Sequence, residues 1–228
     1  MEERSEASCD HCQTGSCLLW QDRGRSSWLM PDELPRSIVF APRQPIYSAE
    51  IAAHGCYLVC EGSVRLALFL PSGDTVVTDI MGPGGVFGLE TLVSERYHME
   101  AQALGETHVA YFSKQSLSGL LQRYPWMSSA LIEHTINQTR SLRQRLVAAA
   151  CRGAREKLAR LLIDLSHSLG GTYECKTIVG ITQGELACML GISRETVSTL
   201  LREFKKDDLV SVQDRRIVIL DESALSRI

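Results

Sequence analysis

Apolar and polar positions change their spacing along the chain, and the changes divide it into regions. Between about residues 35 and 113, short apolar or alternating runs are separated by turn sequences such as Pro71-Ser-Gly-Asp74 and Gly82-Pro-Gly-Gly85. Short, evenly spaced runs of this kind predict β-strands in a closed antiparallel roll or barrel. The expected strands are residues 37–40, 55–62, 63–70, 75–80, 98–104 and 107–112.

A helical spacing replaces this pattern after residue 113. Residues 114–122 predict a short helix, and Pro125 opens a longer one that runs to about residue 149. Positions on the longer helix recur at alternating steps of three and four residues, which places them on one coiled-coil seam. The seam favours a two-fold dimer contact over packing on the roll. It comprises Ile132, Thr135, Thr139, Leu142, Leu146 and Ala149.

Two short helices are expected next, after an amphipathic helix over residues 154–168. Thr182 can cap the first of them because its hydroxyl accepts an otherwise unpaired backbone N–H. Glu185, three residues later, completes a capping box. Gly191 can adopt the positive φ that ends this helix.

The second short helix has one apolar and one polar side. Ser193 can cap it, and its inward stripe at helical spacing is Val197, Leu200, Leu201 and Phe204. Two helices joined in this way predict a helix-turn-helix, whose second helix lies in a DNA major groove. The expected DNA contacts are Arg194, Glu195, Ser198, Thr199 and Arg202, together with Thr182.

A β-hairpin follows and argues against an ordinary helical pair. Its strands are expected at residues 209–212 and 217–220, with the turn at Gln213-Asp214-Arg215. A hairpin behind a recognition helix is a wing. Arg215 and Arg216 are placed where they can touch phosphate.

Charge is divided unevenly along the chain. The net charge is only −3, but residues 1–139 carry 9 basic and 16 acidic side chains, whereas residues 140–228 carry 15 and 11. Phosphate is neutralised only where DNA is met, so the basic half is the half expected to bind it. This half contains the helix-turn-helix.

The chain has 228 residues, of which 44% are hydrophobic, enough for one large domain or two small ones. Its apolar runs are far shorter than the roughly 20 residues that cross a bilayer. The polar, acidic N-terminus does not have the pattern of a secretory signal. We therefore expect a cytoplasmic protein without a membrane partner.

Eight cysteines are many for a cytoplasmic chain, in which stable disulfides are rare. Cys9, Cys12 and Cys17 form a C-x2-C-x4-C run, and thiolates this close can converge on one metal or cluster. Zinc with His11 as an extra ligand, a thiol-based redox or electrophile sensor, and thiols without function are the alternatives.

The order of roll, long helix and winged helix-turn-helix, with Gly191-Ile-Ser-Arg-Glu-Thr-Val-Ser198, resembles the CRP/FNR superfamily of bacterial transcription regulators. Tyr57-Leu-Val-Cys-Glu-Gly-Ser-Val64 and Gly82-Pro-Gly-Gly-Val-Phe-Gly88 are similar to a strand and a turn of the family's roll. We expect an α+β fold and no enzyme. The expected domains are a cysteine-bearing segment (1–34), a sensor roll (35–113), a connecting and dimerisation helix (114–150) and a DNA-binding domain (151–228).

The resemblance implies partners and roles. A homodimer would bind a palindromic operator in double-stranded DNA, with RNA polymerase as a further partner. Arg194 and Glu195 occupy the family's guanine- and cytosine-reading positions, and Ser198 is shared with the FNR branch. Thr199 departs from the arginine that both branches usually carry, so one base preference should differ.

The cyclic-AMP branch of the family has a Gly-Glu-Leu segment followed by Arg-Ser or Arg-Thr. The matching stretches here, Phe87-Gly-Leu-Glu-Thr-Leu92 and Arg96-Tyr-His-Met-Glu-Ala101, have no such arginine pair. Glu90 is displaced from the position of the glutamate in that Gly-Glu-Leu segment, and Glu100 would repel the phosphate of the nucleotide. We therefore expect that this protein does not bind cyclic AMP.

The FNR branch has an N-terminal cysteine run similar to residues 9–17, which holds an oxygen-labile 4Fe–4S cluster. Its fourth cysteine lies late in the roll, where His108-Val-Ala-Tyr-Phe112 has none. Strand alternation places Cys56 and Cys60 on one face, so we expect Cys60, with Cys56 as the alternative, to be the fourth ligand.

Two further readings involve histidine. One is haem ligation by a histidine of the roll or by a cysteine, which the sequence leaves open. The histidines of the roll (His54, His98 and His108) form no spaced metal set, which argues against a cupin-like metalloenzyme.

The FNR branch also places an acidic residue in the dimer seam, where mutual repulsion makes dimerisation conditional. Leu142 stands at that position here. We expect this exchange to strengthen the dimer, so that signalling can proceed by reorientation of dimers that are already formed. An intact cluster would tie the N-terminal segment to the roll and change how the roll packs on the long helix.

Overall fold

The computed structural model describes residues 35–71, 73, 75–150, 153–169, 177–179, 181–213 and 216–228. The chain forms two units, Met1–Val64 with Pro83–Thr135 and Arg65–Gly82 with Ile136–Ile228. Both units combine antiparallel strands with helices, so the expected α+β class is confirmed. Among the described helices, none has the length and hydropathy needed to cross a membrane.

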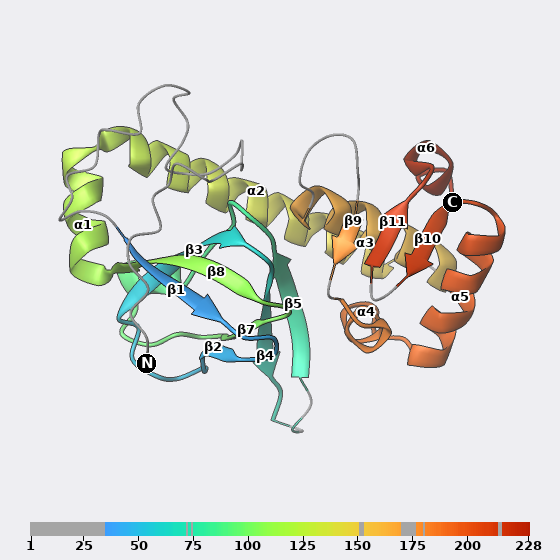
Figure 1. Ribbon diagram of the computed structural model, residues 1–228, viewed down its shortest axis with the longest axis horizontal. Helices are drawn as coiled ribbons and strands as arrows, with labels where there is room; N and C mark the ends of the chain where they lie inside the picture. The colour runs from blue at the N-terminus through green and yellow to red at the C-terminus, as the bar shows by residue number, and fades with distance from the viewer. Residues whose placement is uncertain are drawn as a thin grey trace. The chain divides into compact units, whose positions relative to one another are not determined.

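The first unit contains a four-stranded antiparallel sheet with the order β1-β8-β3-β6. Figure 1 labels its strands β1, β8 and β3. A further antiparallel pair joins β2 to β7. The strands are β1 (Arg36–Phe40), β2 (Pro45–Tyr47), β3 (Gly55–Glu61), β6 (Val86–Phe87), β7 (Glu100–Ala103) and β8 (Thr107–Ser113). The sequence did not predict β2 and β6, because strands this short are not long enough to display an alternating pattern.

Helices cover the core on one side of this sheet. They are the 3-10 helix η3 (Leu89–Leu92), α1 (Lys114–Arg123) and the first turns of α2 (Pro125–Ala150). Ser113 caps α1 by accepting a hydrogen bond from the Ser116 N–H at 3.0 Å. The buried core comprises Cys56, Leu58, Val86, Ala110, Phe112, Leu117, Leu120, Met127, Ala130 and Leu131.

The second unit contains a winged helix-turn-helix (Figure 1). Its helices are α3 (Ala154–Leu169), α4 (Gln183–Leu190), α5 (Arg194–Lys206) and α6 (Glu222–Leu225). The wing strands β10 (Val210–Gln213) and β11 (Arg216–Ile219) pair antiparallel, as predicted within one residue. A third strand that the sequence did not predict, β9 (Thr177–Val179), pairs with the other side of β11.

Two strands from the N-terminal half of the sequence belong to the same unit as the helix-turn-helix. They are β4 (Val64–Phe69), apart from its first residue, and β5 (Thr75–Met81), which are hydrogen-bonded neighbours. Strand β5 contacts both α3 and α4. Cys188 of α4 is half-buried, and its thiol donates to the Thr75 carbonyl at 2.8 Å.

Two glycines of the helix-turn-helix should respond in opposite ways to alanine. Gly191 has φ +63° and open space around its missing Cβ, so Gly191→Ala should lower the free energy of unfolding by about 1–2 kcal/mol through backbone strain alone. Gly184, inside α4 without a positive φ, serves as the control, and Gly184→Ala should be neutral or stabilise by up to about 1 kcal/mol. Urea unfolding of both variants measures the difference, and equal effects would contradict the strain argument.

Candidate nucleic-acid interface and cysteine site

The turn between α4 and α5 is fixed by hydrogen bonds at the start of each helix. Thr182 Oγ1 accepts from the Glu185 N–H at 3.2 Å, and the Glu185 carboxylate accepts from the Thr182 N–H at 2.7 Å. Helix α4 ends at Gly191 in the left-handed conformation. Ser193 Oγ accepts from the Thr196 N–H at 3.1 Å and caps α5. The capping box, the glycine turn and the second cap are therefore confirmed.

Helix α5 buries one side and exposes the other. The buried residues are the expected stripe of Val197, Leu200, Leu201 and Phe204. Successive residues are about 100° apart around a helix, so burial of this stripe turns the opposite side to solvent. That side presents four exposed residues, Arg194, Glu195, Thr199 and Arg202. It also presents Ser198, which is half-buried. Polar groups at the N-terminal end of such a helix are placed to read base edges.

The two arginines of this face differ in their partners. Arg202 Nε donates to the Ser198 carbonyl at 3.3 Å, and its Nη2 lies 3.5 Å from Thr199 Oγ1. Arg194 forms no hydrogen bond or ion pair with any residue in the described part of the chain. Its guanidinium can therefore bind guanine in a bidentate manner, and Glu195 beside it can accept from cytosine N4.

Arg155 of α3 holds α5 in place, a role that the sequence pattern did not reveal. Its Nη1 donates to Glu203 at 2.8 Å and its Nη2 to Asp207 at 2.7 Å. The guanidinium also lies over the Phe204 ring, 4.9 Å from its centroid. The hydrogen bond to Asp207 is the main cause that raises the pKa of Arg155. Arg155 thus holds α5 against α3 on a side of α5 other than the one that carries the expected DNA contacts.

The other expected DNA contacts are placed in part. Arg216 is exposed at the start of β11, opposite Gln213 of β10. Arg215 lies outside the described residues. Thr182 is half-buried, and its Oγ1 also donates to Glu185 Oε2 at 2.8 Å, so its hydroxyl belongs to the capping box.

Cys56 and Cys60 of β3 both pack against the core described above. Cys56 is 2% exposed and lies within that core. Burial raises the pKa of the Cys56 thiol to about 12, because a thiolate would have no water around it. Cys56 is therefore held as a neutral thiol.

Cys60 lies at an irregularity of the sheet. The pairing of β3 with β8 passes from Val59 opposite Val109 to Glu61 opposite His108, which leaves Cys60 as the extra residue of a β-bulge. Its side chain is half-buried, and its Sγ lies 3.8 Å from the Leu58 carbonyl. A bulge redirects a side chain from the regular alternation, so Cys60 is less enclosed than Cys56.

Cys9, Cys12 and Cys17 lie outside the described residues, as does His11. Within the part of the chain that the structure describes, no group of three or more His, Cys, Asp or Glu side chains could hold a metal ion. The described residues thus supply only the candidates for the fourth ligand, Cys60 and Cys56.

Aromatic rings occupy the stretches in which the cyclic-AMP branch places its glutamate and arginine. Tyr97 stacks on Tyr47 with centroids 3.8 Å apart, and Phe87 stacks on Tyr57 at 5.2 Å. The Arg96 guanidinium donates to the Glu50 backbone carbonyl. The absence of cyclic-AMP binding remains a prediction.

Helix α2 exposes most of the predicted seam. Ile132, Leu142 and Leu146 are 60%, 45% and 71% exposed, and Thr135 and Thr139 are also exposed. The side chain of Ala149 lies outside the described residues. Ile136 and Val147, which the heptad reading omitted, are 58% and 59% exposed and widen the apolar stripe.

Two family models match the chain. Residues 37–124 match the cyclic nucleotide-binding domain, and residues 156–228 match the Crp-like helix-turn-helix domain. The first contains the sheet with Cys56 and Cys60. The second contains the capping box, the recognition helix and the wing.

The chain is similar to proteins named as regulators. The nitrogen fixation regulation protein FixK of Azorhizobium caulinodans is 26% identical over 83% of this chain and 77% of its own length. The fumarate and nitrate reduction regulatory protein of Vibrio cholerae is 24% identical over 80% of this chain and 74% of its own. FixK2 of Bradyrhizobium japonicum has the same fold, with a TM-score of 0.75, 21% identity and coverage of 85% and 96%. The chain is a DNA-binding transcription regulator and belongs to the CRP/FNR superfamily.

Proposed function

We propose that this regulator is a homodimer that binds a palindromic operator and senses oxygen or redox state through a 4Fe–4S cluster. Cys9, Cys12, Cys17 and Cys60 would hold the cluster, because thiolates are the usual ligands of such clusters. The observation that carries the proposal is the C-x2-C-x4-C run combined with a half-buried cysteine at a bulge of β3. RNA polymerase is the expected further partner.

The two cysteines of β3 fit a cluster unequally. A ligating cysteine must lose its proton, and the site must be open to the segment that supplies the other ligands. Cys56 meets neither condition, since it is buried and its pKa is raised to about 12. The half-buried Cys60 at the bulge fits better.

The N-terminal segment is long enough to reach Cys60. The described chain begins at Pro35 and enters the sheet through β1, where Arg36 lies opposite Tyr111 of β8. Strand β3 is the second neighbour of β1, which places it about 10 Å away across the sheet. Cys17 precedes Pro35 by 18 residues, which can span up to roughly 60 Å when extended.

Cys60 lies where a tie to the N-terminal segment would affect the dimer helix. When bound, a 4Fe–4S cluster supplies an oxygen-labile centre. Cys60 packs against the core that contains Met127 and Leu131 of the first turns of α2. The same helix carries the exposed apolar stripe farther along. A change in the packing around Cys60 would therefore act on the helix that joins two copies.

The exposed stripe supports the homodimer. Apolar side chains at heptad spacing on the exposed side of a helix form a surface that a second copy of the helix can cover. A two-fold dimer presents two recognition helices, which matches a palindrome with half-sites about one turn of DNA apart. We therefore assign dimerisation to α2.

Anaerobic purification of the full chain should yield a brown protein whose visible absorption bleaches in air. Alanine at Cys9, Cys12, Cys17 or Cys60 should each abolish the colour, because each removes one ligand. Cys188→Ala, outside this set, is the control and should keep it, as should Cys56→Ala. A colourless protein that contains zinc, or loss of colour with Cys56→Ala but not with Cys60→Ala, would contradict the ligand assignment.

Arg194→Ala should weaken binding to the operator by roughly 1–3 kcal/mol, because a bidentate contact to guanine is lost. Binding should also become indifferent to one base in each half-site. The measurement compares a duplex selected from a random library with a random duplex. Arg160→Ala on α3 is the control and should bind as the unchanged protein does. Equal losses on both duplexes would rule out a base-reading role.

Leu146→Glu should convert the dimer to a monomer. Its side chain is 71% exposed, so the fold should tolerate the change, whereas two carboxylates facing each other across the seam repel strongly. Sedimentation equilibrium measures the mass. Val93→Glu, at a position that is 90% exposed, is the matched control and should remain dimeric. A Leu146→Glu protein that stays dimeric would exclude this face of α2.

A further inference from the structure

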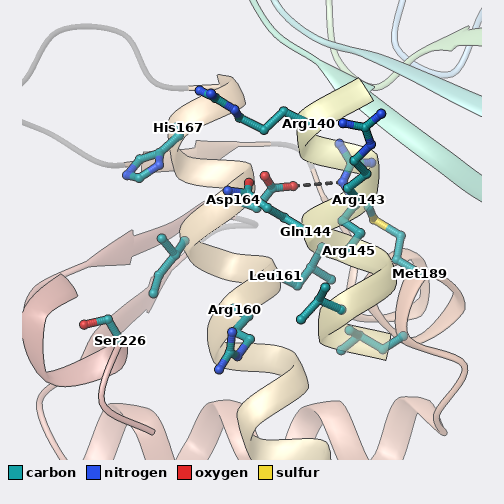
Figure 2. A pocket seen from close by; sticks show the side chains of 13 residues that line it. Arg140, Arg143, Gln144, Arg145, Arg160, Leu161, Asp164, His167, Met189 and Ser226 are labelled. Carbon is teal, nitrogen blue, oxygen red and sulfur yellow. Dashed lines mark hydrogen bonds and ion pairs between the residues drawn. The ribbon is translucent and has the colours of Figure 1, made fainter. Parts of the chain in front are cut away.

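One buried ionic cluster joins three segments of the second unit. Arg145 of α2 donates through Nε to Asp164 of α3 at 2.8 Å and through Nη2 to Asp79 of β5 at 2.7 Å. Its Nη1 donates to the Thr78 carbonyl at 2.7 Å. Ser141 Oγ donates to Asp164 and accepts from Arg145 Nη2 at 2.9 Å. Figure 2 shows the pair of Arg145 and Asp164 between α2 and α3.

This cluster depends on the guanidinium of Arg145. The side chains of Arg145, Asp79 and Asp164 are only 14%, 13% and 13% exposed. Burial raises the pKa of Asp79, and the charge and hydrogen bond of Arg145 oppose that shift. Without the guanidinium, two carboxylates would remain close together and poorly hydrated. Such an arrangement is strongly unfavourable.

Polar side chains connect α2 to α3 beside a pocket. A cavity of about 490 Å³ lies between the two helices, with Leu161 and Met189 in its lining (Figure 2). Arg145 and Asp164 also line it. The ionic cluster beside this pocket joins α2 to both α3 and β5.

The cluster spans the joint between the dimer helix and the DNA-binding helices. Helix α2 ends at Ala150, and α3 begins at Ala154. Arg145 precedes this joint and Asp164 follows it. Helix α3 contacts both α4 and α5, so its orientation sets that of the recognition helix.

We propose that Arg145 is a positioning residue for DNA recognition: it binds Asp79 and Asp164 together and so holds α3, with the helix-turn-helix, at one angle to α2 and β5. A fixed angle lets two recognition helices meet half-sites at one separation without the entropic cost of ordering them on DNA. The inference rests on the proposed dimer and its palindromic operator.

The test is a series of operator duplexes with one to three base pairs added or removed between the half-sites. Each base pair rotates one half-site against the other by about 34°. The unchanged protein should bind one spacing best and lose affinity steeply on either side. Asp79→Ala and Arg145→Met should bind the best spacing about tenfold more weakly, with a flatter profile across the series. Arg160→Met, which removes an ion pair with Glu156 of the same helix, should keep the unchanged profile.

A spacing profile of Asp79→Ala that matches the unchanged protein would overturn the proposal. An equal loss at every spacing would also overturn it, because that indicates weaker base contacts rather than lost orientation. Asp79→Ala carries the test if Arg145→Met fails to fold, since it leaves the Arg145–Asp164 pair balanced.

Hydrogen exchange without DNA separates this inference from the proposed function. In Asp79→Ala, backbone amides of β5 and α3 should exchange faster, while those of β8 in the first unit should not change. Unchanged exchange in β5 and α3 would overturn the positioning role even if the protein binds its operator. Failure of the unchanged protein to bind any duplex with two half-sites would instead contradict the dimeric operator, and the exchange result would still decide the role of Arg145.

Discussion

The DNA-reading surface depends on the burial of the opposite side of the same helix. Each of the four buried side chains of α5 contributes about 1.5–3 kcal/mol relative to exposure. Rotation of α5 by one residue, about 100°, would expose part of this stripe and bring Arg194 inward without a partner. Both changes are unfavourable, so the helix has one rotational setting. Arg155 reinforces that setting, because it binds Glu203 and Asp207 and covers the ring of Phe204.

The sequence predicts what is determined by neighbours in the chain. The capping pairs Thr182–Glu185 and Ser193–Thr196 each span three residues, and Gly191 marks its turn through its own conformational freedom. The helix-turn-helix was therefore predictable nearly residue by residue. The partners of Arg155 and Arg145 are as much as 52 and 67 residues away in sequence, and no periodicity reports such pairs. The three-residue strand β9 was missed for a related reason, since its pairing with β11 defines it.

The cysteines of β3 show how far strand alternation can be used. Alternation places Cys56 and Cys60 on one face, and both do pack against one core. It does not give the depth of either side chain. The bulge at Cys60 arises from the register with β8, whereas Cys56 lies opposite Phe112 in regular pairing. Their chemical difference, a fully buried neutral thiol and a half-buried one, is thus a property of the sheet and not of the motif.

In the proposed dimer, the seam on α2 joins the two copies, and the ionic cluster around Arg145 sets the orientation of the recognition helix. Leu142, 45% exposed, stands in the seam where the FNR branch has an acidic residue, so no like charges meet there to oppose assembly. We therefore expect a signal to act on how each copy directs its recognition helix rather than on the separation of the two copies. The joint between α2 and α3 is the place where orientation is set in this proposal, because Arg145 binds Asp164 of α3 and Asp79 of β5 there. Helix α2 belongs to both units: its first turns contribute Met127 and Leu131 to the core that Cys60 packs against, and Arg145 lies near its other end.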